Sequence, residues 1–173
     1  MALQRETKSF LAFLQGRPDV RGKIRAAPGR TLLYAGTFFK PVWKEIAELK
    51  RARPEFAAKE LLPDVLARIP VPGTGHPHLL AYAQGVERAV PWRPDGFIVW
   101  RALSGIFAAN AVGPVSFQIG SDVAASGKVF AATELAVLLR NPNVDARTKD
   151  VLAYYQGCIQ NKKTAINFGF ISG

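Results

Sequence analysis

The stretch FIVWRALSGIFAANAVGPVSFQIGSDV, residues 97–123, decides how the fold of this chain is predicted. Its first part has apolar residues at helical spacing and predicts a helix over residues 97–112. After Gly113 and Pro114 the apolar pattern changes to that of a strand, PVSFQIGSD, which ends in a Gly-Ser turn. A helix that stops abruptly and runs into a strand is typical of a domain that mixes both kinds of structure.

One face of the predicted helix combines aromatic rings with a hydroxyl group. Trp100 and Ser104 are four residues apart and Phe107 follows one turn later, so the three side chains lie along one line. Such a face is suited to lining a pocket. The simpler alternative is that both rings pack in the core and that the serine hydroxyl bonds back to its own helix.

A carboxylate follows the next apolar segment. Glu134 comes directly after VFAAT, which we expect to be a strand, and directly before the apolar run LAVLL. A carboxylate in that position should be half-buried, which is costly unless a partner or a function requires it. The alternative is a structural glutamate that binds a helix N-terminus or an arginine.

The rest of the chain shows further helical and strand-like segments. Asp145 is a good N-cap for the last predicted helix. Helices are expected over residues 3–15, 42–53, 54–69, 78–90 and 146–161, and strands over residues 31–36 and 164–172.

This order of elements predicts an α+β fold. The N-terminal part, residues 1–92, is mainly helical, and residues 93–173 alternate strand and helix. We therefore expect a single domain over residues 1–173, in which a helical N-terminal lobe packs on a C-terminal lobe with a small, mostly parallel sheet. The C-terminal lobe would carry Glu134.

The composition is that of a packed globular protein. Hydrophobic residues make up 49% of the 173 residues, and no apolar run reaches the roughly 18 residues of a membrane span. We see no signal-peptide pattern, and the single cysteine, Cys158, rules out an internal disulfide. His76 and His78 share a Pro/Gly-rich loop and are expected to be exposed. With so few candidate ligands, no metal site is expected.

The formal net charge is +10, from 23 basic and 13 acidic residues. Such a charge attracts polyanions, which include nucleic acids, acidic proteins and phosphorylated small molecules. A solvated basic surface with no specific partner accounts for the charge equally well. Charge alone therefore names no function.

The spacing of these residues resembles that of the ADP-ribosyl cyclase and NAD glycohydrolase family. The resemblance covers W-x-x-x-S-x-x-F-A-x-x-A, a Gly-Ser turn after a strand, and F-x-x-x-E before an apolar run. The matching residues are Trp100, Ser104, Phe107, Ala108, Ala111, Gly120, Ser121, Phe130 and Glu134. Upstream, TLLYAG is similar to a family element in which a tryptophan stands where this chain has Tyr34.

The resemblance implies an ADP-ribosyl-cyclase-like fold, NAD as the substrate and no cofactor. Glu134 would stabilise the positive charge that develops on the ribose, and Ser104 would bond to the ribosyl intermediate. Water would give ADP-ribose as the main product, with some cyclic ADP-ribose formed by attack of the adenine. The implied substrate-binding residues are Trp100, Tyr34, Phe107, Gly120, Ser121 and Phe130.

A basic, nearly cysteine-free domain of this kind resembles bacterial polymorphic toxins. It would be delivered without a cleavable signal peptide, deplete NAD in a recipient cytoplasm and be neutralised in the producer by an acidic immunity protein. Two other classes stay open. One is a nuclease toxin that acts on nucleic acid, which the charge supports, and the other is a non-enzymatic interaction domain.

Overall fold

The computed structural model describes residues 2–35, 39–126, 129–167 and 169–171. This part of the chain is mainly helical, with a small sheet. In chain order the elements are α1 (Arg5–Gly16), α2 (Pro18–Lys23), β1 (Leu32–Ala35), α3 (Phe39–Ala52), α4 (Pro54–Ala57), α5 (Leu62–Leu66), α6 (Leu79–Ala89), the kinked turn η1 (Trp92–Gly96), α7 (Phe97–Ala109), β2 (Ser116–Ile119), α8 (Val123–Ser126), the π-type turn η2 (Phe130–Glu134), α9 (Leu135–Arg140), α10 (Ala146–Gln160) and β3 (Gly169–Ile171).

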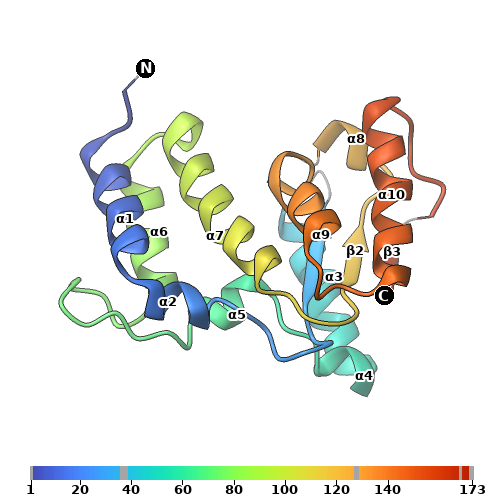
Figure 1. Cartoon of the computed structure of the whole chain (residues 1–173), viewed down its shortest axis with the longest axis horizontal. Helices are drawn as coiled ribbons and strands as arrows, with labels where there is room; N and C mark the ends of the chain where they lie inside the picture. The colour runs from blue at the N-terminus through green and yellow to red at the C-terminus, as the bar shows by residue number, and fades with distance from the viewer. Residues whose placement is uncertain (1, 36–38, 127–128, 168, 172–173) are drawn as a thin grey trace.

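The helices form two groups that meet at α7. In Figure 1, α1, α2 and α6 lie on one side of α7, and α8, α9 and α10 lie on the other side with the sheet. α7 contacts α1 and α6 in the first group and η2 and α9 in the second. The helix predicted around Trp100 and Ser104 is therefore confirmed, and it is the element that joins the two halves of the molecule.

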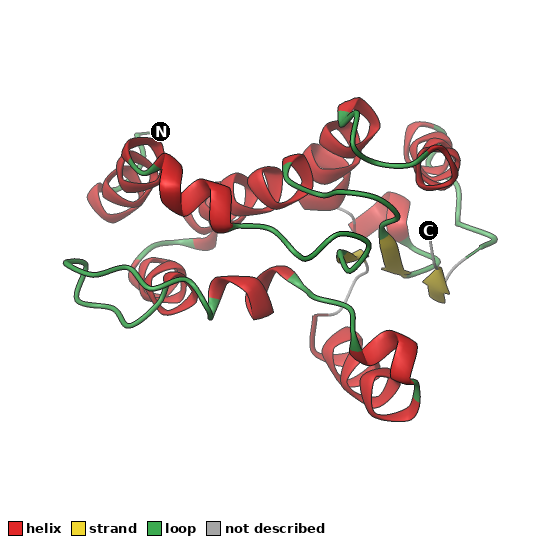
Figure 2. Ribbon diagram, turned by 60° about the horizontal axis from the view of Figure 1, so that its bottom comes forward, coloured by secondary structure: helices red, strands yellow, loops and turns green. Residues whose placement is uncertain are grey.

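The sheet has the strand order β1-β2-β3. β1 pairs with β2 in parallel, whereas β2 and β3 are antiparallel, and all three strands are short (Figure 2). The α+β class is confirmed. The expectation of a mostly parallel sheet confined to the C-terminal lobe is wrong, because β1 comes from the N-terminal half and the second pairing is antiparallel.

A glycine turn connects α7 to β2. Gly113 has a φ of 78°, in the left-handed region that glycine adopts without steric cost. Its N–H donates to the carbonyl of Asn143 at 2.7 Å, which ties the turn to the segment before α10. The change of apolar pattern seen in the sequence at this point therefore marks a real reversal of chain direction.

The prediction that VFAAT forms a strand is wrong. Residues Phe130–Glu134 form η2, which continues directly into α9. A short apolar run fits a strand or a buried helical turn equally well, because period alone does not separate the two. The helix capped by Asp145 is confirmed, since its side chain accepts from the N–H of Thr148 at 3.2 Å.

The main hydrophobic core extends through both halves of the chain. It includes Phe10 and Leu14 from α1, Leu103 and Phe107 from α7, and Tyr155 from α10. A second, smaller cluster contains Leu32, Ile46, Phe56 and Leu61. Phe170 packs edge-on against Phe56, with the ring centroids 4.4 Å apart. The two halves are thus stabilised by a shared interior rather than joined by a linker.

Candidate functional site

The candidate site lies where α7 packs on η2. The helix surface at this contact carries Gly105, and a Cβ atom added there would lie 3.1 Å from the Cγ2 atom of Thr133. A glycine at this position therefore lets the two elements approach closely. The approach brings Ser104 of α7 and Glu134 of η2 together.

Ser104 and Glu134 form a buried polar pair. The two residues are 5% and 6% exposed, and the hydroxyl of Ser104 donates a hydrogen bond to the Glu134 carboxylate. Glu134 ends a π-type turn, a distortion of the helix that is frequently found at functional sites. The sequence singled out both residues, although it placed Glu134 after a strand rather than within a helical segment.

The electrostatic state of Glu134 follows from its burial. Desolvation raises the pKa of this carboxyl from an ordinary value of 4.5 to about 8, and the hydrogen bond from Ser104 acts in the opposite direction. Without a cationic partner, Glu134 therefore holds a proton at neutral pH. A positive charge placed beside it would favour the carboxylate.

Trp100 lies one helical turn before Ser104 and is half-buried. Its indole Nε1–H donates to Oε2 of Glu87, on α6, at 2.9 Å. This bond fixes the orientation of the indole ring, because it holds the ring at its polar edge. The sequence analysis did not single out Glu87, although its position four residues after the buried Ala83 puts it beside the face of α6 that turns inward.

Tyr34, Gly120 and Ser121 belong to one edge of the sheet. Tyr34 lies opposite Gln118 in the parallel pairing, and Gly120 and Ser121 follow the end of β2. Tyr34, Gly120 and Ser121 are half-buried, whereas Gln118 is buried. Because β1 and β2 are parallel, their carboxyl ends meet at this edge, where open α/β sheets commonly bind ligands.

Two carbonyl groups of the turn after β2 accept hydrogen bonds that hold the turn in place. The carbonyl of Gly120 accepts from the N–H of Val123 at 3.2 Å, and that of Ser121 accepts from the N–H of Ala165 at 2.8 Å. The second bond attaches the turn to the segment that follows α10. The Gly-Ser turn is therefore fixed by one bond within the turn and one to a distant segment.

Phe107 and Phe130 lie in the main core. They are 0% and 2% exposed, and Phe130 packs edge-on against Phe117 with the ring centroids 6.2 Å apart. In this arrangement they support the α7–η2 contact from the interior and offer almost no surface to a ligand. Of the residues singled out in the sequence, these two match the core-packing alternative.

The histidines have structural contacts. The Nδ1 atom of His78 accepts from the N–H of Ala81 at 3.1 Å and caps α6, while His76 stacks on Tyr82 with the ring centroids 5.0 Å apart. Both are half-buried, so the expectation of exposed loop histidines is wrong. Cys158 is buried.

The described residues contain neither a cluster of metal ligands nor a membrane-spanning helix. No group of three or more His, Cys, Asp or Glu side chains in this part of the chain is placed so that it could hold a metal ion. Among the same residues, no helix has both the length and the apolar character that crossing a membrane requires.

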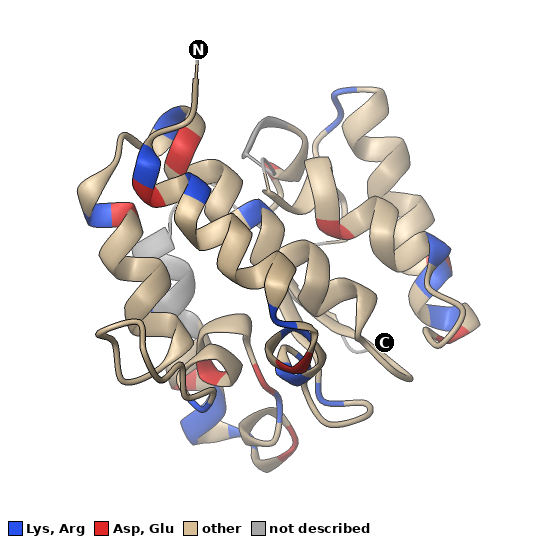
Figure 3. Ribbon diagram, turned by 60° about the vertical axis from the view of Figure 1, so that its left-hand side comes forward, with Lys and Arg blue, Asp and Glu red and all other residues tan. Residues whose placement is uncertain are grey.

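The excess of basic residues is distributed over several elements. Figure 3 shows Lys and Arg on the N-terminal helices and near α10, with fewer acidic residues among them. The net charge of +10 thus acts as a general positive field over much of the surface.

Comparison with protein-family models, with curated proteins and with solved structures finds no match to this chain.

Proposed function

We propose that this protein is an NAD glycohydrolase with an ADP-ribosyl-cyclase-like active site, in which Glu134 and Ser104 act on the bond between nicotinamide and ribose. The observation that carries the proposal is the buried, hydrogen-bonded pair of these two side chains at the α7–η2 contact. A buried carboxyl whose serine partner lies one helical turn from Trp100 suits a reaction that builds positive charge on a sugar.

The reaction would proceed through an oxocarbenium-like ribose. The bond between C1′ of the ribose and N1 of the nicotinamide breaks, and its electron pair goes to the ring nitrogen, so that nicotinamide leaves as a neutral molecule. The Glu134 carboxylate stabilises the positive charge on the sugar. Water then adds to C1′ and gives its proton to Glu134, which yields ADP-ribose.

The raised pKa of Glu134 fits this chemistry. The nicotinamide ring of NAD is cationic, so its binding beside Glu134 would lower the pKa of the carboxyl and release the proton. At neutral pH the negative charge would then be present mainly when the substrate is bound. Such a group is protonated, and costs less to keep buried, in the free protein.

Two aromatic residues are proposed to hold the nicotinamide. Trp100 is the first, because its ring is half-buried, one turn from Ser104 and oriented by Glu87. Tyr34 is the second, at the carboxyl end of β1. Cationic rings are attracted to aromatic faces, most strongly to tryptophan.

The direct test is to incubate the purified protein with NAD and separate the products by chromatography. We expect nicotinamide and ADP-ribose, formed equally well in the presence of EDTA because the carboxylate, not a Lewis acid, stabilises the sugar. The value of kcat/KM should rise with pH and level off above about 8, since the free protein must lose the Glu134 proton. Intact NAD together with degraded RNA or DNA would instead support the nuclease alternative.

A role as a toxin that acts in a recipient cytoplasm is proposed from the resemblance to polymorphic toxins, the net charge of +10 and the single cysteine. Expression in a bacterial cytoplasm should lower the cellular NAD content before growth stops, and Glu134→Gln should abolish both effects. An acidic immunity protein would restore NAD, and its association rate should fall with added salt because the net charge of +10 speeds the encounter. Growth arrest with an unchanged NAD content would contradict this role.

A further inference from the structure

Arg101 lies next to the candidate site and has no role in the chemistry described above. It is exposed on α7, three residues before Ser104, which places it about 4.5 Å along the helix axis towards the N-terminus. Its Nε–H donates to the Oγ1 atom of Thr133 at 2.9 Å. The side chain therefore reaches across the α7–η2 contact instead of extending into solvent.

The anchor of Arg101 is itself fixed. Thr133 packs against Gly105 and directly precedes Glu134 in η2. The guanidinium group is thus held beside Thr133, the residue that precedes Glu134, and the α7–η2 contact that positions Glu134 also positions Arg101. An arginine held through Nε keeps its terminal nitrogen atoms for another acceptor.

The charge of Arg101 is not balanced by a carboxylate among the residues that the structure describes. The ion pairs found there involve Arg17, Lys44, Lys50 and Arg68, each with a nearby acid. Arg101 instead bonds a neutral hydroxyl, which leaves its full positive charge at the surface. A planar guanidinium with free terminal N–H groups matches the geometry of phosphate oxygens.

We infer that Arg101 binds the diphosphate of the nucleotide substrate and makes the site selective for dinucleotides over nucleosides. This inference rests on the proposed function, because it assumes that the ribose lies at Glu134. On that ribose the 5′ carbon, which carries the first phosphate, is one sugar ring away from the reacting C1′. A cation fixed on Thr133, one residue before Glu134 and on the exposed side of the α7–η2 contact, is placed to meet that phosphate.

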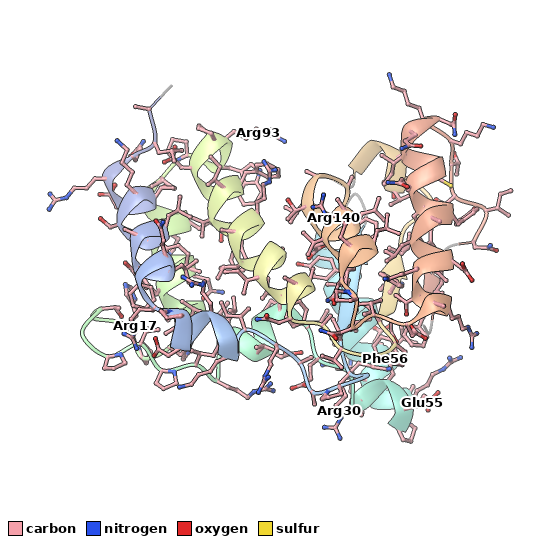
Figure 4. The ribbon with its side chains drawn as sticks, in the orientation of Figure 1. Arg17, Arg30, Glu55, Phe56, Arg93 and Arg140 are labelled. Atoms are coloured by element: carbon pink, nitrogen blue, oxygen red, sulfur yellow. The ribbon has the colours of Figure 1, made fainter. Side chains whose placement is uncertain are left out.

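The first arm of the test measures binding of ADP-ribose by calorimetry. Arg101→Ala should weaken binding about 10- to 100-fold, the loss expected for hydrogen bonds to a charged group. The matched control is Arg30→Ala, which removes the same charge from another exposed arginine. In Figure 4, Arg30 lies near α4, whereas Arg93, which marks the start of α7, lies at the opposite end of the molecule. Thr133→Val removes the anchor but keeps the charge, and it should cost less than Arg101→Ala.

Three outcomes of this arm would overturn the inference. Wild-type protein that does not bind ADP-ribose has no diphosphate site. Equal losses for Arg101→Ala and Arg30→Ala would mean that only the overall charge matters. Equal losses for Arg101→Ala and Thr133→Val would mean that Arg101 serves only to hold α7 against η2.

The second arm compares NAD with nicotinamide riboside, which lacks the diphosphate. Arg101→Ala should raise the KM for NAD about 10- to 100-fold and leave kcat/KM for nicotinamide riboside within about twofold. Wild-type protein that cleaves NAD, with an unchanged KM in Arg101→Ala, would overturn this inference alone. Binding of ADP-ribose through Arg101 without any cleavage of NAD would overturn the proposed function and leave the diphosphate site standing.

Discussion

Replacing Glu134 by glutamine is expected to lower kcat for NAD cleavage by a factor on the order of 10² to 10³ while the protein stays folded. The amide keeps the size of the side chain and still accepts the hydrogen bond from Ser104. It lacks the negative charge needed opposite the developing oxocarbenium ion. The loss should therefore appear in kcat rather than in the affinity for the product.

The same substitution should change the pH dependence of stability. Folded Glu134 has a pKa of about 8, whereas the unfolded chain titrates near 4.5, so the folded state holds a proton that the unfolded state loses between these values. The contribution of Glu134 to the free energy of unfolding therefore falls as the pH rises from about 4.5 to about 8. Glu134→Gln removes this fall. The difference in melting temperature between Glu134→Gln and the wild-type protein should therefore grow as the pH rises over that range and then stay constant.

A matched control is Glu60→Gln. Glu60 is half-buried, but it accepts from the N–H of Ala27 at 2.8 Å and forms an ion pair with Arg68, so losing its charge should lower stability slightly and leave kcat unchanged. Glu134→Gln should differ from it in both respects. If Glu134→Gln is less stable than wild type and fully active per folded molecule, Glu134 is a structural residue.

Much of the fold follows from local patterns in the sequence. The helix around Trp100, the strand after Pro114 and the helix capped by Asp145 are all found where their periodicity and capping residues predict them. These signals act within a few residues, so a single sequence contains them. The segment before Glu134 was assigned wrongly because its five apolar and small residues are compatible with either structure.

Local patterns in the sequence predict the candidate site only in part. Ser104 and Glu134 are singled out by residue type and spacing, and the structure places them in contact. The bonds from Trp100 to Glu87 and from Arg101 to Thr133 join residues 13 and 32 positions apart. No local pattern records such pairs, because they arise only when α7 packs against its neighbours. The roles of Glu87 and Arg101 therefore emerge from tertiary structure alone.

Asn141 is a second residue that only the structure explains. In the sequence it belongs to NPN, which is typical of a turn. In the structure it is 5% exposed, and its Nδ2 atom donates to the carbonyls of Ala108, Ala109 and Ala111 at 2.9–3.1 Å. These carbonyls end α7, so the residue that follows α9 satisfies the C-terminus of α7.

This contact links Asn141 to the candidate site. It fixes the end of α9 to the end of α7, and α9 continues directly from η2, which carries Glu134. The Oδ1 atom also accepts from the N–H of Asn143 at 2.9 Å, which orients the amide. Asn141 therefore contributes to the alignment of α7 with η2, together with the Gly105–Thr133 contact and the bond from Arg101 to Thr133.

Asn141→Ala is expected to lower the free energy of unfolding by about 2–4 kcal/mol, because buried carbonyls lose their donor. For a chain of this length, that corresponds to a fall in melting temperature of about 5–15 °C. Asn141→Asp should be worse at neutral pH than at acid pH, because a carboxylate facing carbonyl oxygens is repelled while its protonated form can donate.

The matched control is Asn161→Ala. Asn161 caps the end of α10 in the same manner, since its Nδ2 atom donates to the carbonyl of Gly157 at 2.8 Å, but this bond is exposed and water can replace it. Its loss should cost less than about 1 kcal/mol. If the two alanine variants are equally stable in thermal denaturation, burial of the Asn141 amide does not hold α7 to α9. The alignment of Ser104 with Glu134 must then come from the other α7–η2 contacts, which are the apolar packing and the bond from Arg101 to Thr133.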